Sequence, residues 1–190
     1  MLRRSFLILL AVLAFSLPAS GEPTKPSDPD KPVLLVGDSL AYMLAPRLWK
    51  VAKKDYGKKF YSDAKGGTNA EQWIREHWFL DALRRVKPGY VIISLGVNDH
   101  GVPINRKKFP ERAKKLVQLA HHHGVKVVFL LPPKLRYPID AVRRGIRESG
   151  ADLIHDAEPL GIELINDGIH PSAKGAEAWA KDLGHFLWSQ

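Results

Sequence analysis

Short apolar runs alternate with helix-like patterns from residue 33 almost to the end of the chain. Three of the runs, at 33–37, 90–96 and 125–132, are nearly continuously apolar, which is typical of parallel strands covered on both faces. Two less apolar runs complete the series. The expected strands lie at residues 33–37, 59–64, 90–96, 125–132 and 151–157.

Between these runs, apolar residues recur every three to four positions, as they do along the buried face of a helix. The first expected helix begins at residue 39, and the second opens at the capping-box pattern Thr68-x-x-Glu71 and continues through Ala82. Three more are expected around residues 109–120, over 138–149 and after a Ser172 cap. Strand–helix units in this order predict an α/β fold, an open, doubly wound parallel sheet with helices on both faces.

The first 32 residues lack this alternation. Residues 1–21 carry two arginines, then a mostly apolar stretch and then small residues, which is the layout of a secretory signal peptide. Residues 22–32 contain four prolines and alternating charge, as in an extended linker. We therefore expect a signal peptide over 1–21, a Pro-rich linker over 22–32 and one domain over 33–190. The protein would be periplasmic or secreted, with no stable membrane insertion after cleavage; a retained anchor is the alternative.

Composition adds two constraints. The chain has no cysteine, so no disulfide holds it together, and its core must suffice. Its formal net charge is +9, with the basic residues spread along the expected helices. This pattern indicates a solvated basic surface, or attraction to anionic envelope polymers or lipid head groups. No nucleic-acid partner is expected, because the chain carries the pattern of an export signal and no recognisable nucleic-acid-binding module.

Polar residues follow four of the five expected strands. Ligand sites in such folds lie outside the carboxyl ends of the strands, so these segments should meet at one edge of the sheet. In chain order they are Gly37-Asp38-Ser39-Leu40, Gly66-Gly67-Thr68-Asn69, Gly96-Val97-Asn98-Asp99 and Asp167-Gly168-Ile169-His170.

The four segments contain what acyl transfer requires. Ser39 supplies a nucleophile, His170 a base, and Asp167 a carboxylate that orients the imidazole. The backbone N–H groups of Ser39 and Gly66 and the side-chain amide of Asn98 supply donors for an oxyanion hole. Each residue taken alone also fits a helix cap or a turn. Four such signals in this order favour the catalytic interpretation.

These blocks resemble those of the SGNH (GDSL) hydrolase superfamily, and the likeness covers nearly all of residues 33–188. The resemblance implies a three-layer α/β/α sandwich with a five-stranded, flavodoxin-like parallel sheet. It also implies a triad of Ser39, Asp167 and His170 with an oxyanion hole of Ser39, Gly66 and Asn98. Gly66 is preferred to Gly67 because the family pattern Gly-x-Thr then places Thr68 correctly. We expect Ser39 to cap its helix as well.

Three residues near these blocks are candidates for lining the pocket: Asp38, Trp73 and His100. For Trp73, a place in the core is the stronger alternative. The run at 121–123 is all histidine, but its side chains would splay around a helix end instead of converging on a metal. The chemistry needs neither a metal ion nor an organic cofactor.

The loops after the expected strands are short, which predicts an open, shallow cleft suited to small acyl groups or to a surface polymer. Since superfamily membership alone does not choose a substrate, export and charge guide the choice. They favour an exported esterase acting on O-acetyl groups of an envelope polysaccharide or peptidoglycan. The alternatives are a periplasmic thioesterase/lysophospholipase-like hydrolase, a carbohydrate O-acetyltransferase using the same triad, and a binding module on an inactive scaffold.

Overall fold

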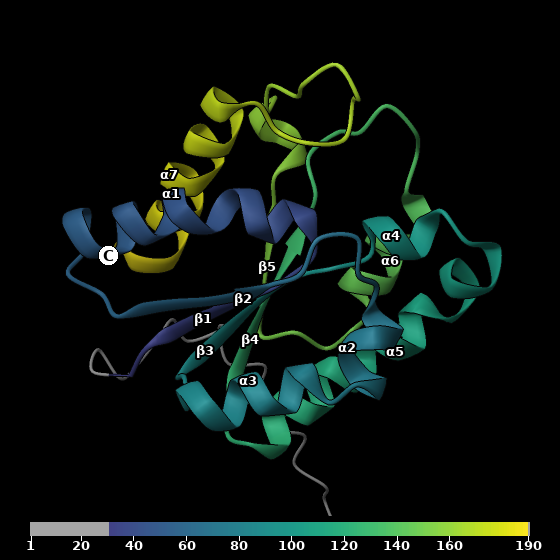
Figure 1. Ribbon diagram of the computed structural model, residues 1–190, viewed down its shortest axis with the longest axis horizontal. Coiled ribbons are helices and arrows are strands. Elements are labelled where there is room, and N and C mark those ends of the chain that lie inside the picture. The colour runs from purple at the N-terminus through teal and green to yellow at the C-terminus, as the bar shows by residue number, and fades with distance from the viewer. Residues whose placement is uncertain (1–30, 190) are drawn as a thin grey trace, which may run out of the picture.

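A computed structural model describes residues 31–189 (Figure 1). The predicted signal peptide and residues 22–30 of the predicted linker lie outside the described residues. Five parallel strands form one sheet in the order β2-β1-β3-β4-β5. All five predicted strands are present: β1 (Val33–Gly37), β2 (Phe60–Ala64), β3 (Tyr90–Ser94), β4 (Lys126–Leu131) and β5 (Leu153–Asp156).

The burial of the strands explains their sequence patterns. Every residue of β1 and β3 is buried, as is all of β4 after Lys126, because helices cover both faces of the sheet. The edge strands β2 and β5 are only partly buried, and they are the two runs with the weaker apolar character. The register pairs Gly37 with both Ala64 and Ser94, so three neighbouring strands end at one level.

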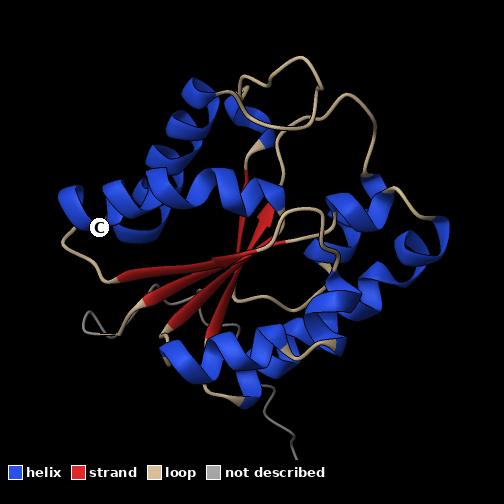
Figure 2. Cartoon of the chain, in the orientation of Figure 1, coloured by secondary structure: helices blue, strands red, loops and turns tan. Residues whose placement is uncertain are grey.

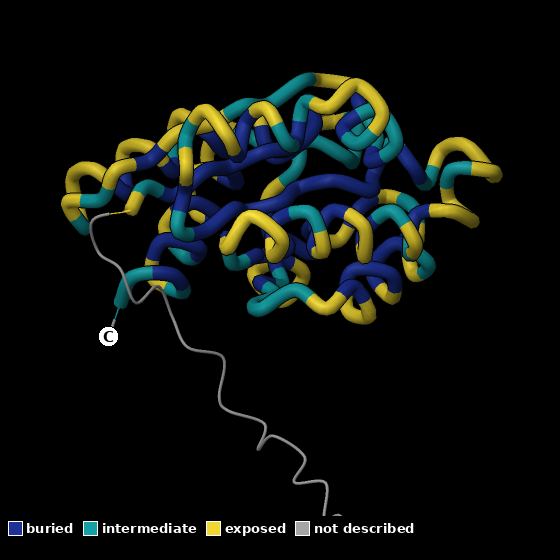
Figure 3. Tube along the Cα trace, turned by 90° about the horizontal axis from the view of Figure 1, so that it is seen from below, coloured by how far each residue is buried: buried dark blue, intermediate teal, exposed yellow. Residues whose placement is uncertain are grey.

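The helices form the two outer layers of the sandwich (Figures 1 and 2). On one face lie α1 (Ser39–Asp55) and α7 (Ala173–Trp188), which pack against each other. The other face is covered by α2 (Ala70–Arg75), α3 (Trp78–Val86), α5 (Pro103–His122) and α6 (Asp140–Arg147). A short α4 (Val97–His100) and a 3₁₀ turn at Glu158–Leu160 lie in the connecting segments. The buried strands therefore lie between two layers whose outer sides are exposed (Figure 3). The three-layer α/β/α prediction is confirmed.

The second predicted helix is wrong in two respects. It is two helices, α2 and α3, because His77 between them adopts a left-handed conformation with φ of +58°. Its capping box is formed by Asn69 and Gln72, each accepting a 3.0 Å hydrogen bond from the other's backbone N–H. The short α4 and the early start of α5 at Pro103 were not predicted from the sequence.

No helix within residues 31–189 has both the length and the apolar character needed to cross a bilayer. The parallel register of the sheet brings the carboxyl ends of neighbouring strands to one level. The segments after β1, β2 and β3 leave the sheet side by side, and the chain returns to them just before α7.

Candidate active site

Three side chains from two distant parts of the chain form one hydrogen-bonded series at the carboxyl edge of the sheet. Ser39 is the first residue of α1, and its Oγ lies 2.8 Å from Nε2 of His170. Nδ1 of His170 lies 2.6 Å from Oδ2 of Asp167. All three residues are partly exposed, so a substrate can reach them. The geometry is that of a hydroxyl beside an imidazole whose far nitrogen is held by a carboxylate.

Asp167 is fixed by its own loop. Its Oδ1 accepts backbone hydrogen bonds from Ile169 at 2.8 Å and His170 at 2.9 Å. The hydrogen bond with the His170 side chain, together with these backbone donors, lowers the pKa of Asp167 to about 2. The carboxyl group is therefore ionised at neutral pH and accepts the Nδ1–H of the imidazole. This leaves Nε2 as the acceptor that faces Ser39.

The helix cap is Asp38, and the prediction that Ser39 caps α1 is wrong. Asp38 has an extended backbone, and its Oδ1 accepts the N–H of Leu40 at 3.0 Å. Ser39 is already helical, so its hydroxyl is not used by the helix end. The division of roles follows from position, because only the last non-helical residue can turn its side chain back onto the first-turn N–H groups.

Asp38 is buried, with 1% of its surface exposed, so the prediction that it lines the pocket is also wrong. Burial raises the pKa of its carboxyl group to about 7, and the nearby carboxyl group of Asp99 adds to this effect. Its Oδ2 lies 3.4 Å from Nδ2 of Asn98. Asp38 is thus a buried structural residue at the junction of β1, α1 and the Asn98 segment.

The amide of Asn98 is held beside the turn that follows β2. Its Nδ2 donates to the carbonyl oxygen of Thr68 at 2.9 Å. That turn comprises Lys65 to Thr68, and Gly67 within it has a φ of +74°, which favours glycine. Gly66 is exposed at the tip of the turn. The structure therefore brings the Gly66 turn, Asn98 and the start of α1 to the same edge.

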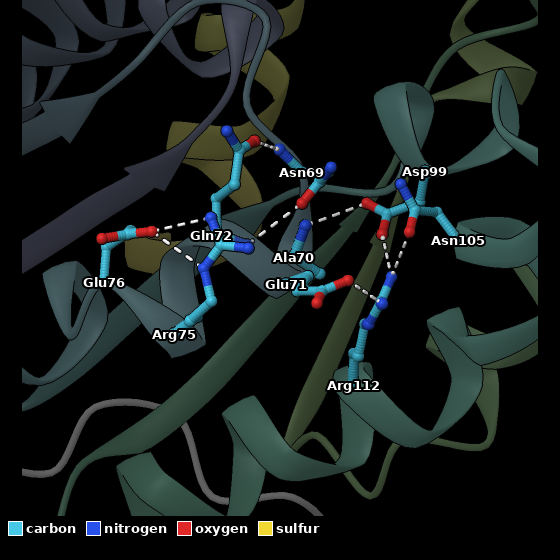
Figure 4. Close-up of polar contacts among 9 residues, drawn as sticks. All are labelled: Asn69, Ala70, Glu71, Gln72, Arg75, Glu76, Asp99, Asn105 and Arg112. Atoms are coloured by element: carbon cyan, nitrogen blue, oxygen red, sulfur yellow. Dashed lines mark hydrogen bonds and ion pairs between the residues drawn. The ribbon is translucent and has the colours of Figure 1, made fainter.

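An ion-pair network centred on the buried Asp99 supports this arrangement (Figure 4). Asp99 is fully buried, and its Oδ2 accepts the N–H of Ala70, the first residue of α2, at 3.0 Å. Its Oδ1 lies 3.4 Å from Arg112 of α5, which also bonds to Asn105 at 3.0 Å and pairs with Glu71 of α2. This network joins α2, α4 and α5, and it holds the Asn98 segment against the Gly66 turn. Arg112 was not identified from the sequence, where it is one basic residue among 29.

Comparison with known proteins assigns this geometry to a family. A family model described as GDSL-like lipase/acylhydrolase matches residues 35–178, which is most of the chain and includes all the residues above. The chain belongs to the GDSL-like lipase/acylhydrolase family. The predicted SGNH (GDSL) resemblance is confirmed, and the protein is a hydrolase of ester bonds.

Solved structures agree with this hydrolase in fold. The lipase/acylhydrolase from Enterococcus faecalis is 20% identical with a TM-score of 0.65, covering 84% of this chain and 98% of its own. The acetyl xylan esterase AlAXEase is 16% identical with a TM-score of 0.66, covering 82% and 98%. An acetyl xylan esterase from Geobacillus stearothermophilus is 16% identical with a TM-score of 0.59, covering 79% and 91%. No match was found among curated protein sequences.

Of the other two predicted pocket residues, Trp73 belongs to the core of the hydrolase. Its side chain is fully buried, and its indole N–H donates to Oγ1 of Thr68 at 2.9 Å. The ring also packs edge-on against Trp78, with centroids 6.0 Å apart. The prediction that Trp73 lines the pocket is therefore wrong, and the core alternative is correct. Its function is to support the turn that carries Gly66.

His100 is partly exposed and stacks on Tyr137, with ring centroids 5.1 Å apart and an interplanar angle of 8°. Tyr137 was missed in the sequence because it lies in the irregular segment between β4 and α6. The backbone N–H of its neighbour Arg136 donates to Gly168 O at 2.8 Å, which ties this segment to the triad loop. Burial raises the pKa of Tyr137, with a contribution from the charges of Asp38 and Asp167.

The histidine-rich helix end has a local partner. Nε2 of His121 lies 2.7 Å from Oδ2 of Asp152, and the rings of His122 and His123 contact each other edge-on. Within the described part of the chain, no group of three or more His, Cys, Asp or Glu side chains is placed to hold a metal ion.

Proposed function

We propose that this hydrolase cleaves short acyl esters, O-acetyl esters above all, through a covalent acyl-Ser39 intermediate. The observation that carries the proposal is the series Ser39 Oγ–His170 Nε2 at 2.8 Å and His170 Nδ1–Asp167 Oδ2 at 2.6 Å. Both distances allow proton transfer without rearrangement. A serine that only served the fold would not need an imidazole fixed on its hydroxyl.

The first half of the reaction forms the acyl-enzyme. Oγ of Ser39 attacks the ester carbonyl carbon while Nε2 of His170 takes the hydroxyl proton. The negative charge on the former carbonyl oxygen is met by the backbone N–H groups of Ser39 and Gly66 and by the amide of Asn98. When the tetrahedral intermediate collapses, the bond to the alcohol oxygen breaks and His170 returns the proton to the leaving alcohol.

The second half repeats these steps with water. His170 removes a proton from water as the water attacks the acyl carbon, and the same donors stabilise the second oxyanion. Collapse breaks the bond to Ser39 Oγ, which regains its proton, and the carboxylic acid is released. The side-chain amide of Asn98 has two hydrogens, and only one of them is donated at a normal distance, to Thr68 O. The other hydrogen can therefore be donated to the oxyanion. The 3.4 Å approach to Asp38 is too long to compete with a full oxyanion.

Two observations support short acyl groups on a carbohydrate. Helices start directly after β1 and β3, so these two connections add little chain that could enclose a long acyl group. Two of the similar structures are acetyl xylan esterases. An envelope location rests on the N-terminal sequence pattern alone. Another similar structure is a lipase/acylhydrolase, which favours the lysophospholipase-like alternative. Acyl length is therefore the property to measure.

The test uses p-nitrophenyl esters from acetate to dodecanoate with the wild type, Ser39→Ala and a matched Ser62→Ala control. Ser62 is exposed on β2 and has no part in the hydrogen-bonded series. We expect kcat/KM to be highest for acetate, to be unchanged in the control and to fall by at least 10³ in Ser39→Ala. A kcat/KM that rises with chain length would contradict the short-acyl proposal. An acyl group that passes from donor ester to an added sugar in preference to water would identify a transferase.

A further inference from the structure

The solvent-facing side of α1 carries an apolar stripe that the fold does not explain. Tyr42 is 67% exposed and Trp49 is 45% exposed. With Pro46 and Lys53 they fall at positions i, i+4, i+7 and i+11, which is one line along a helix. The core-facing side of α1 is a separate stripe that includes Leu44 and Leu48. The outward face of a surface helix is ordinarily polar.

This stripe faces the edge strand of the sheet. α1 runs alongside β2 (Figure 1), and Tyr61 of β2 is 53% exposed. Two hollows lie between the elements, one of about 560 Å³ lined by Tyr42, Pro46 and Trp49, and one of about 410 Å³ lined by Trp49 and Tyr61. Trp49 borders both, so the two hollows are adjacent, and together we term them the α1–β2 groove.

The α1–β2 groove starts beside the catalytic residues and leads away from them. At its upper end, Tyr42 lies three residues after Ser39, and Ala64 is the last residue of β2 before the Gly66 turn. At its lower end the groove reaches the loop that precedes β2, at the amino-terminal end of that strand. Tyr42 and Trp49 are seven residues apart, or about 10 Å along the helix axis. The two hollows therefore lie one after the other along α1, an arrangement that suits an extended chain.

The charge in the groove is positive. Lys53, Lys58 and Lys59 line its lower part, and none of them forms an ion pair with another of the described residues 31–189. Nζ of Lys53 lies 5.0 Å from the centre of the Trp49 ring. The carboxylate in the upper part, Asp63, is already paired with Lys65 at 3.1 Å and Arg85 at 2.8 Å. The lysines are free to bind an anionic partner.

We propose that the α1–β2 groove binds the chain of an anionic polysaccharide that carries the ester cleaved at Ser39. This inference rests on the proposed function and extends it to a substrate class. The exposed rings of Tyr42 and Trp49, about 10 Å apart along the helix axis, offer flat apolar surfaces for sugar rings, and Tyr61 is exposed at the lower hollow. The unpaired lysines suit carboxylate groups on those sugars. A groove favours an extended chain over a bilayer, because a flat membrane surface does not enter a concave site.

Binding is tested without reference to activity. Protein purified from the expressed full chain is run in native gels containing either polygalacturonate, which is anionic, or neutral xylan. We expect polygalacturonate to retard the wild type more strongly, and Trp49→Ala/Tyr61→Ala to raise the Kd at least tenfold. Trp49→Phe, which keeps a flat ring, should stay within threefold of the wild type. Lys53→Ala/Lys59→Ala should lose affinity, whereas the exposed pair Lys107→Ala/Lys108→Ala on α5 should not.

Activity gives the second readout. For Trp49→Ala/Tyr61→Ala, kcat/KM on acetylated polygalacturonate should fall at least tenfold, and kcat/KM on p-nitrophenyl acetate should stay within twofold of the wild type. Circular dichroism establishes that each variant is folded. Unchanged polymer affinity in the folded variant would overturn the inference. An equal loss of polymer affinity in Lys107→Ala/Lys108→Ala would overturn it too. Trp49-dependent binding to phosphatidylglycerol vesicles without polymer binding would also overturn it, because that result indicates a membrane surface as the partner. A wild type that binds polymer but hydrolyses no ester would refute the proposed function instead, because the binding readout does not depend on it.

Discussion

The buried Asp38 makes stability depend on pH in a way that one substitution isolates. Burial raises the pKa of its carboxyl group from 3.8 to about 7. In that interval the unfolded chain has lost the proton and the folded chain keeps it. The contribution of protonated Asp38 to the free energy of unfolding is complete below about pH 4 and is lost as the pH rises through 7. A shift of about 3 units corresponds to about 4 kcal/mol in total, of which roughly 3 kcal/mol falls between pH 5 and 8.

Asp38→Asn removes the titration while keeping the helix cap. The asparagine oxygen can still accept the N–H of Leu40, which Asp38 accepts at 3.0 Å. The other titrating groups are common to both proteins and cancel in the difference, apart from the smaller coupling between Asp38 and Asp99. We therefore expect the free energy of unfolding of Asp38→Asn, relative to the wild type, to increase by roughly 3 kcal/mol from pH 5 to pH 8.

The assay is urea unfolding of both proteins at pH 5, 6, 7 and 8. Asp63→Asn is the matched control. Although some burial opposes it, hydrogen bonds from Arg85 and Lys65 lower the pKa of Asp63 below 3.8, so this group is ionised in both states throughout the range. Its difference from the wild type should be constant over these four pH values. A constant difference for Asp38→Asn as well would show that Asp38 is ionised in the folded protein and would refute the reasoning.

Three further substitutions probe the catalytic edge and its support. Asn98→Ala removes one oxyanion donor, so kcat on p-nitrophenyl acetate should fall by about 10²–10³ with KM little changed; a loss below threefold would remove Asn98 from the mechanism. Asp167→Asn presents an amide to Nδ1 of His170 and no longer fixes the tautomer, so kcat should fall by about 10⁴, and retention of a tenth of the activity would contradict the triad. In Gly37→Ala the new Cβ would lie 2.1 Å from Ser94 O, so urea unfolding should show that the free energy of unfolding falls by about 3 kcal/mol or more. Gly66→Ala is the control, because open space surrounds its Cβ position, and its free energy of unfolding should be nearly unchanged.

The sheet and the triad residues were predictable because their signals are local. Continuous apolar runs mark β1, β3 and β4, and the motifs after the strands are contiguous in the chain. The residues that the motifs name converge in space only because parallel strands end at one level. Gly37 illustrates this, since it lies in register with Ala64 and Ser94 and directly precedes the Asp38–Ser39 junction.

The errors arose where tertiary contacts choose between equivalent local patterns. Thr68-x-x-Glu71 and Asn69-x-x-Gln72 are capping signatures one residue apart. The structure uses the second because the Thr68 hydroxyl instead donates to Lys65 O and accepts from Trp73. That second contact also draws Trp73 into the core.

Arg112 and Tyr137 carry no local signal at all. Arg112 matters because it reaches the buried Asp99 from another helix, and Tyr137 because its irregular segment is hydrogen-bonded to the triad loop through Arg136 and Gly168. Neither contact has a sequence pattern of its own. Only the packing of distant segments assigns these residues to the site.

The central claim is that Ser39 is the nucleophile, and its covalent capture tests that claim most directly. Wild-type protein is treated with a fluorophosphonate, which phosphonylates activated serines, and the adduct is located by peptide mass spectrometry. We predict one adduct, on the peptide that contains Ser39, with loss of esterase activity in proportion to labelling, and no adduct in Ser39→Ala or in His170→Ala. An adduct on a different residue, or full activity after Ser39 is labelled, would contradict the account.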